Sequence, residues 1–257
     1  MITDLHCHTN FSTDAISTIS QMLEAAESRN IDIIAITDHA DFAPGDSCVE
    51  PEPYMEELNK NAGKKVKLLK GIEVGLQFEH RHAFSEFMKR AKYDFVIGSM
   101  HRCLEQDFLE GQFYQNRSVE ECWQVYFTET LKAMQSCPDF DSLGHLDIIT
   151  RYHTMTGQNL HEDLFPYLDP VLEWLIENQK GLEINTSKFH IFSRCHPQPL
   201  ILKRYRQLGG KIITLGSDAH SAEFVGRNLD KGIEAARSAG FSQFAWFEQR
   251  KLRFADF

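Results

Sequence analysis

The chain has 257 residues, of which 42% are hydrophobic and 25% charged, a composition typical of a soluble globular protein with one large domain or two small ones. Its formal net charge of −10 argues against binding of nucleic acid polymers through a basic face, and no stretch approaches the roughly 18 apolar residues of a membrane span. The first residues lack the basic and apolar regions of a signal peptide, so we expect a cytoplasmic protein with no membrane partner.

Short apolar runs alternate with longer amphipathic stretches along the chain, and the runs have the length and apolar content of buried parallel strands. The runs are Ile2–Leu5, Ile31–Ile36, Val66–Ile72, Phe95–Ile97, Leu143–Ile149, Gly181–Ile184, Ile212–Leu215 and Phe244–Phe247. Four segments, which begin at Ile19, Phe84, Trp123 and Leu168, have apolar residues at the spacing of an amphipathic helix. Residues 40–53 and 157–163 are predicted to be loops. The alternation predicts a parallel sheet, open or closed into a barrel. Because no segment has the composition of a linker, we predict a single domain over residues 1–257.

Ionisable side chains follow six of these runs. The segments are His6-Cys7-His8, Thr37-Asp38-His39, Gly71-Ile72-Glu73, Ser99-Met100-His101, Gly144-His145 and Gly216-Ser217-Asp218-Ala219-His220. Active sites of parallel α/β folds lie at the carboxyl ends of the strands, so we expect these side chains to share one site. In extended backbone, residues i and i+2 point the same way, which places His6 beside His8 and Asp218 beside His220. Imidazole nitrogens with carboxylate oxygens predict a site for several zinc, manganese or iron ions.

In this order, and over nearly the whole chain, the six segments resemble the polymerase and histidinol phosphatase (PHP) superfamily. The resemblance implies a distorted (β/α)7 barrel of seven parallel strands, with a site for three divalent metal ions (Zn, Mn or Fe) at its C-terminal face. Since the chain has eight strand-like runs, we expect Phe244–Phe247 to lie outside the barrel or at its edge.

The resemblance also implies three ligand sets, carried over residue by residue. The first set is His6, His8, Glu73 and Asp218; the second is Glu73, His101 and His145, with Glu73 bridging; the third is Asp14, His39 and His220. Asp14 has an alternative interpretation, because a carboxylate at this position could instead cap the helix that follows.

Within the superfamily, the chain is more similar to the histidinol-phosphatases of histidine biosynthesis than to the polymerase modules. The similar features are the long segment between His101 and His145, residues 181–187 with the later His196-Pro197-Gln198-Pro199, and the tail. The resemblance thus implies a hydrolase, a phosphoric monoester hydrolase that converts L-histidinol phosphate to L-histidinol and phosphate.

Two alternatives stand beside this function. Residues 12–18 and 185–189 also resemble broad-specificity phosphatases or phosphodiesterases that act on other small phosphates or nucleotides, and the metal ligands are common to both groups. The second alternative is a metal-binding module with a structural role. Such a module could lose metal ligands, whereas every ligand position of this chain holds a residue that can bind a metal. The small phosphorylated substrate and the oligomeric state are not determined by the sequence.

The mechanism expected from this site is attack on phosphorus by a hydroxide that bridges two metals beside Glu73. The three ions would add about six positive charges, which reconciles an acidic chain with an anionic substrate. Arg151 is a candidate phosphate ligand, as are Arg194 and Lys188, between which the sequence does not decide. Asp38 could orient His39 or carry a proton to the leaving oxygen.

Overall fold

Seven parallel strands form the central sheet of the computed structural model, which describes residues 1–63 and 65–257. Their order in space is β1 (Thr3–Asp4), β2 (Ile33–Ile36), β4 (Lys67–Gly75), β5 (Phe95–Ser99), β8 (Ser142–Leu143), β9 (Gly181–Asn185) and β10 (Ile213–Gly216). The short β3 (His39–Ala40) also pairs with β4. The first and last strands meet, because Leu5 N donates to Leu215 O at 2.9 Å and Cys7 forms a parallel bridge to Ala219. The sheet is therefore a nearly closed barrel, as the resemblance implied.

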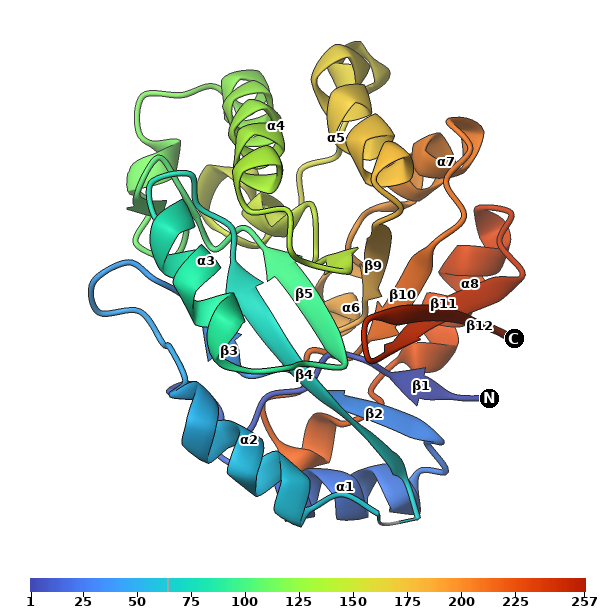
Figure 1. Cartoon of the computed structure of the whole chain (residues 1–257). Helices are drawn as coiled ribbons and strands as arrows, with labels where there is room; N and C mark the ends of the chain where they lie inside the picture. The colour runs from blue at the N-terminus through green and yellow to red at the C-terminus, as the bar shows by residue number, and fades with distance from the viewer. Residues whose placement is uncertain (64) are drawn as a thin grey trace.

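Helices surround the barrel (Figure 1). They are α1 (Ile19–Ser28), α2 (Pro51–Lys60), α3 (Arg81–Arg90), α4 (Val119–Ser136), α5 (Phe165–Glu177), α6 (Phe189–Phe192), α7 (Pro199–Gln207) and α8 (Leu229–Ser238). The 3-10 turns are η1 (Gln112–Tyr114), η2 (Ile148–Arg151), η3 (His153–Met155), η4 (Glu162–Leu164) and η5 (Ala222–Phe224). Capping boxes at Thr18 and Ser118 start α1 and α4, each satisfying backbone N–H groups that the helix leaves free. Among the described residues, no helix is long and apolar enough to cross a membrane.

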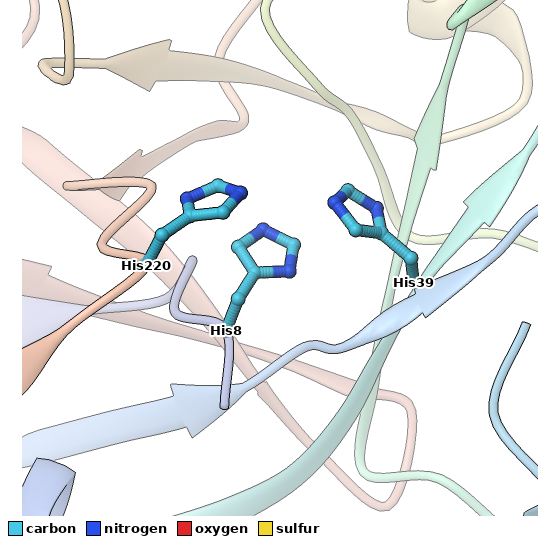
Figure 2. A group of neighbouring side chains, drawn as sticks. All are labelled: His8, His39 and His220. Carbon is cyan, nitrogen blue, oxygen red and sulfur yellow. The ribbon is translucent and has the colours of Figure 1, made fainter. Parts of the chain in front are cut away.

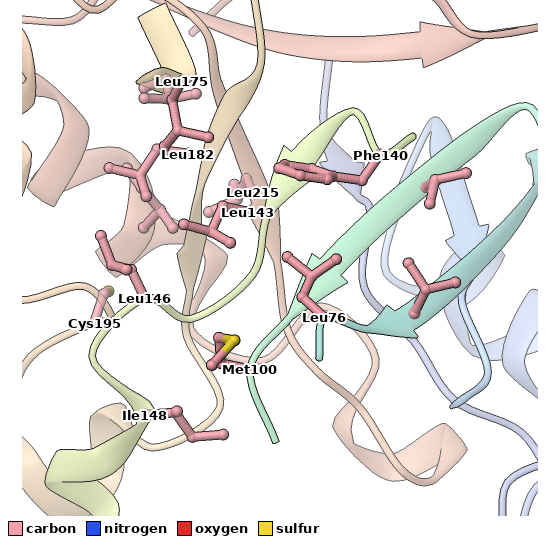
Figure 3. Packing of buried hydrophobic residues seen from close by; sticks show 14 of the residues in the cluster. Leu76, Met100, Phe140, Leu143, Leu146, Ile148, Leu175, Leu182, Cys195 and Leu215 are labelled. Carbon is pink, nitrogen blue, oxygen red and sulfur yellow. The ribbon is translucent and has the colours of Figure 1, made fainter. Parts of the chain in front are cut away.

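Two separate hydrophobic clusters follow from the alternation of side chains along each strand. Ile34 and Ile36 of β2 point outward into the large cluster beneath the helices, part of which is shown in Figure 3. Ile33 and Ala35 of the same strand point inward. The smaller, inner cluster is completed by Leu5, Leu69, Phe95, Ile97, Ala245 and Phe247. Both faces of β2 are therefore buried, which explains why this strand is a continuous apolar run.

A C-terminal hairpin of β11 (Gln243–Glu248) and β12 (Lys251–Asp256) closes the N-terminal end of the barrel. The hairpin forms its own antiparallel sheet, which confirms that Phe244–Phe247 lies outside the barrel strands. Phe247 stacks on Phe95 with ring centroids 5.5 Å apart. At the hairpin turn, Arg250 Nε lies 2.6 Å from Asp141 Oδ2, just before β8. The opposite, C-terminal end of the barrel is thereby left for the loops that carry the predicted ligands.

Three features differ from the sequence prediction. The predicted strand Leu143–Ile149 pairs only at Ser142–Leu143, and Ile148–Arg151 forms η2. The chain leaves the sheet at His145, whose φ of 22° is incompatible with an extended strand. Within the predicted loop 40–53, helix α2 already begins at Pro51, a residue whose fixed φ suits the first helical turn. A small hairpin of β6 (Arg102–Cys103) and β7 (Gln106–Asp107) was also not predicted.

Replacement of Phe247 by alanine is expected to destabilise the protein by about 3–5 kcal/mol, because it removes a buried ring from the inner cluster. The matched control is Phe254→Ala on the partner strand, where the side chain is 44% exposed and the loss should be about 0.5 kcal/mol. Urea denaturation measures both free energies of unfolding. Equal losses for the two variants would contradict the proposed closure of the barrel by the hairpin.

Candidate metal centre and active site

The predicted ligands gather at one end of the barrel, on the floor of a cavity of about 500 Å³. They come from six strand ends: His6 and His8 after β1, His39 in β3, Glu73 in β4, His101 after β5, His145 after β8, and Asp218 and His220 after β10. His39 and Glu73 are register partners in the β3–β4 pair, which fixes their side chains next to each other. The distribution explains why the ligands are far apart in the chain and adjacent in the fold.

The Glu73 carboxylate is the centre of this cluster. Five imidazole rings each place a nitrogen within 3.5 Å of one of its oxygens: His6, His8, His39, His101 and His145. Ser99 Oγ donates a further hydrogen bond of 2.6 Å to Oε1 of the same carboxylate. Glu73 is completely buried, so its charge is isolated from water and needs nearby positive charge.

Asp218 and Asp14 extend the cluster toward the cavity mouth. Asp218 Oδ1 lies 3.4 Å from His8 Nε2 and 3.5 Å from His220 Nδ1. Asp14 Oδ2 lies 3.1 Å from His220 Nε2 and 3.6 Å from His39 Nε2. The Asp14 side chain is 54% exposed, whereas Asp218 is buried. Figure 2 shows the rings of His8, His39 and His220 turned toward one another from three separate elements.

The donor set fits divalent metal ions. Five groups of three donors each have ligand atoms within 4.8 Å of one another, among them His6–His8–Glu73 and Glu73–His101–His145. Within the part of the chain that the structure describes, the buried atom Glu73 Oε2 makes no hydrogen bond, although it faces the ring nitrogens of His8 and His39. Buried polar atoms without partners are costly, and a cation coordinated by the cluster compensates for that cost.

The pKa values in the cluster show the same need for positive charge. Burial would raise the pKa of Glu73, but the charges of His6, His101 and His39 outweigh it and hold this pKa well below its usual range. Burial would lower the pKa of His39, yet Glu73 and Asp14 raise it to about 10. Burial, with the charges of His39 and His220, lowers the pKa of His8 well below its usual value. These directions fit a cluster that binds cations, with the lowered pKa of His8 favouring the neutral ring that can act as a ligand.

Two carboxylates that sequence reasoning missed orient the ligand rings. Glu183 Oε1 lies 2.5 Å from His6 Nδ1, and its Oε2 accepts a 2.8 Å hydrogen bond from His145 N. Asp41 Oδ1 lies 2.9 Å from His101 Nδ1. Both contacts turn the Nε2 atom of the ring toward Glu73, which is the arrangement that fixes imidazole ligands around a metal. The available signal for Glu183 was a lone acidic residue inside the apolar run Gly181–Ile184.

Asp38 lies outside the lining of the cavity. Its carboxylate accepts hydrogen bonds of 2.7 Å from both Thr9 N and Thr9 Oγ1, and one of 2.6 Å from Ser12 Oγ. Ser12 Oγ in turn accepts from His39 N at 3.0 Å. Asp38 thus ties the loop after β1 to the start of β3. Both roles suggested for it, orienting His39 and moving a proton, stay predictions.

The predicted phosphate ligands occupy different places. Arg151 and Lys188 line the cavity, and Arg151 Nη1 lies 3.4 Å from Asp218 Oδ2. Arg194 does not line it; its guanidinium donates to Asn159 Oδ1 and, at 3.1 Å, to Gln158 O. Arg102 and Arg227, which the sequence analysis did not single out, also line the cavity.

The seven-stranded barrel with its cluster of imidazoles and carboxylates defines a metal-binding protein of the PHP type. The family model described as PHP domain matches residues 4–187, and the chain belongs to this family. This confirms the resemblance found in the sequence and the fold that it implied.

The similar proteins belong to a narrower group than the family model describes. The chain is 31% identical to a probable histidinol-phosphatase of Clostridium acetobutylicum, over 99% of this chain and 100% of the relative. It is 30% identical to the histidinol-phosphatase of Lactococcus lactis, over 97% and 95% of the two chains. The crystal structure of the L. lactis histidinol phosphate phosphatase, complexed with zinc, L-histidinol and phosphate, superimposes with a TM-score of 0.87 at 29% identity and covers 98% of both chains.

Glu183→Gln is expected to lower the affinity for zinc roughly 10- to 100-fold, because the neutral amide no longer polarises the His6 ring. Competition with a chromophoric chelator measures that affinity directly. Glu177→Gln, at an exposed position at the end of α5, is the matched control and should bind zinc as the unmodified chain does. Unchanged zinc affinity in the Glu183 variant would show that this carboxylate serves only the packing of β9.

Proposed function

We propose that this protein is a metal-dependent histidinol-phosphatase, a phosphoric monoester hydrolase that converts L-histidinol phosphate to L-histidinol and inorganic phosphate. The observation that carries the proposal is the Glu73-centred cluster, which lies beside cavity-lining cations in a chain that matches histidinol-phosphatases over its full length. The setting we propose is histidine biosynthesis in the cytoplasm, where the six free cysteines would stay reduced.

The ligand assignment that we propose keeps the three sets expected from the sequence. The first two sets are supported by the compact groups His6–His8–Glu73 and Glu73–His101–His145. For the third, the proximity of Asp14 to both His39 and His220 supports a site at the cavity mouth. Zinc is the first candidate ion, since the L. lactis structure contains it, and manganese and iron suit the same nitrogen and oxygen donors.

Divalent ions held in this cluster would acidify water and neutralise the charge that develops on the phosphoryl oxygens. The side chains of the protein would position the phosphate group of the substrate. Arg151 reaches Asp218 with one nitrogen and Asn185 Oδ1 with the other, so its guanidinium is held at the edge of the cluster. A guanidinium fixed in this way binds phosphate oxygens with little further loss of side-chain freedom. Lys188 lines the same wall and supplies a second charge.

The remaining lining suits the rest of the proposed substrate. L-histidinol phosphate carries an ammonium group and an aromatic imidazole ring besides its phosphate. The lining also contains the apolar residues Phe108 and Leu109, together with Asp46 and Asp107, whose carboxylates lie 2.6 and 3.8 Å from the Arg102 guanidinium. An aromatic or aliphatic wall accepts the imidazole ring, so the cavity offers complementary surfaces to the phosphate and to the ring.

Phosphate release from L-histidinol phosphate is expected to depend on metal and to exceed release from other phosphomonoesters and from nucleotides at equal concentration. Chelator-treated protein and His145→Ala should lose activity by at least about 100-fold, because the variant removes a nitrogen 3.0 Å from Glu73. His161→Ala, at an exposed position away from the cluster, is the control. Activity spread evenly over the panel would instead favour a broad-specificity phosphatase or phosphodiesterase.

Arg151→Met is expected to raise KM for the phosphate ester about 10- to 100-fold, the effect of losing a charged hydrogen bond to phosphate. Arg194→Met should have a smaller effect, because Arg194 is engaged with Gln158 and Asn159 outside the cavity lining. Steady-state kinetics on the metal-loaded variants compare the two. A larger effect at Arg194 would mean that the loop carrying it moves onto the bound substrate.

A further inference from the structure

Arg227 is a fixed cation in the cavity wall. Its guanidinium lies over the ring of Phe224, 4.2 Å from the centroid, and its Nη2 donates a 2.6 Å hydrogen bond to Ser187 O. Thr186 Oγ1 returns a hydrogen bond of 2.6 Å to Arg227 O. The loop before α8 and the segment after β9 therefore hold Arg227 from both its backbone and its side chain, so little conformational entropy is left to lose when it binds a ligand.

Among the described residues, no carboxylate forms an ion pair with this arginine. Arg102, Arg204 and Arg250 each form an ion pair with an aspartate, but none of the described acidic residues pairs with Arg227. Its Nε is buried and makes no hydrogen bond to any described atom. A half-buried guanidinium with an unused buried donor is costly unless an anion occupies the space in front of it. The cavity, which Arg227 lines, is where such an anion would lie.

Three cations meet around Ser187. Arg151 donates to Ser187 Oγ at 3.2 Å, Arg227 donates to the carbonyl oxygen of the same residue, and Lys188 is next in the chain. Burial and the charges of Arg151 and Arg227 lower the pKa of Lys188, which is the expected result of gathering like charges. An anion bound between them would remove this repulsion.

The three cations lie at different depths. Arg151 reaches the metal cluster, because its Nη1 lies 3.4 Å from Asp218 Oδ2. Arg227 makes no described contact with a predicted metal ligand and reaches only Ser187 and Phe224. An anion with oxygens on several sides can contact the metal cluster and Arg151 with one edge while another oxygen faces Lys188 and Arg227.

We propose that Arg227, with Lys188, is a specificity-determining pair that selects phosphate monoesters over diesters; this inference rests on the proposed phosphatase function. A monoester phosphate is a dianion with three oxygens free of ester bonds. One of these oxygens can therefore contact Arg227 while the other two contact the metal cluster on the cavity floor. A diester has one negative charge and two free oxygens. Its second ester group would occupy the place of the third oxygen and leave Arg227 unpaired.

The test compares Arg227→Met and Arg227→Lys on L-histidinol phosphate and p-nitrophenyl phosphate as monoesters, and on bis(p-nitrophenyl) phosphate as the diester. Methionine keeps much of the stem that packs on Phe224 and removes the charge. We expect kcat/KM for both monoesters to fall about 10- to 100-fold, mostly through KM, while the diester changes less than about threefold. The lysine variant should recover part of the loss because it restores the charge.

The matched control is Arg237→Met, which removes a guanidinium that lies over Phe257 on the exposed side of α8. This variant should behave as the unmodified protein does. An independent readout is calorimetric binding of inorganic phosphate to the zinc-loaded protein, which should weaken about tenfold in Arg227→Met and stay unchanged in Arg237→Met.

Equal losses on monoesters and diester, or unchanged phosphate binding, would overturn the proposal and reduce Arg227 to a residue that holds the segment after β9. Where diester hydrolysis is too slow to follow, its inhibition constant against the monoester replaces kcat/KM. If the unmodified protein hydrolyses no phosphate ester, the proposed function fails separately. Phosphate binding then still decides whether Arg227 recognises the anion.

Discussion

The buried carboxylate of Glu73 is the constraint on which the site depends. A charge with no access to water is stable only among compensating groups, and five imidazole rings surround this one at hydrogen-bonding or coordination distance. The carboxylates of Glu73 and Asp218, turned to a common centre, require positive charge between them, which protons on the rings or bound cations can supply. The proposed hydrolytic function rests on supplying that charge with metal ions.

Closure of the barrel brings the ligands to Glu73. The bridge between Cys7 and Ala219 joins the ends of the first and last strands, and both of these residues point into the outer core. Their neighbours His6 and His8 lie against Glu73 on the other side, and Asp218 and His220 lie next to His8 and Asp14 in the same cluster. The hairpin β11–β12 fills the far end of the barrel, so the ligand end rests on a packed core.

Charge is distributed asymmetrically around the cavity. The carboxylates of Glu183 and Asp41 orient the rings of His6 and His101 from behind, while Arg151, Lys188 and Arg227 stand on the wall formed by the later strands. The phosphate ester proposed as substrate would therefore meet three cations on one wall of the cavity. This asymmetry explains how a chain with a net charge of −10 can receive an anionic substrate.

The sequence by itself determined the fold class and, through the family resemblance, the candidate ligands, because buried parallel strands are local apolar runs and the candidate ligands other than Asp14 lie in such a run or just after it. It could not show Glu183, Asp41 or Arg227 as parts of the site, nor the left-handed turn at His145 that ends β8 early. These features depend on contacts between distant segments: Glu183 matters because it reaches His6, 177 positions away. Only tertiary structure decided which polar groups face the ligands, because hydrogen bonds between strand ends have no local sequence pattern.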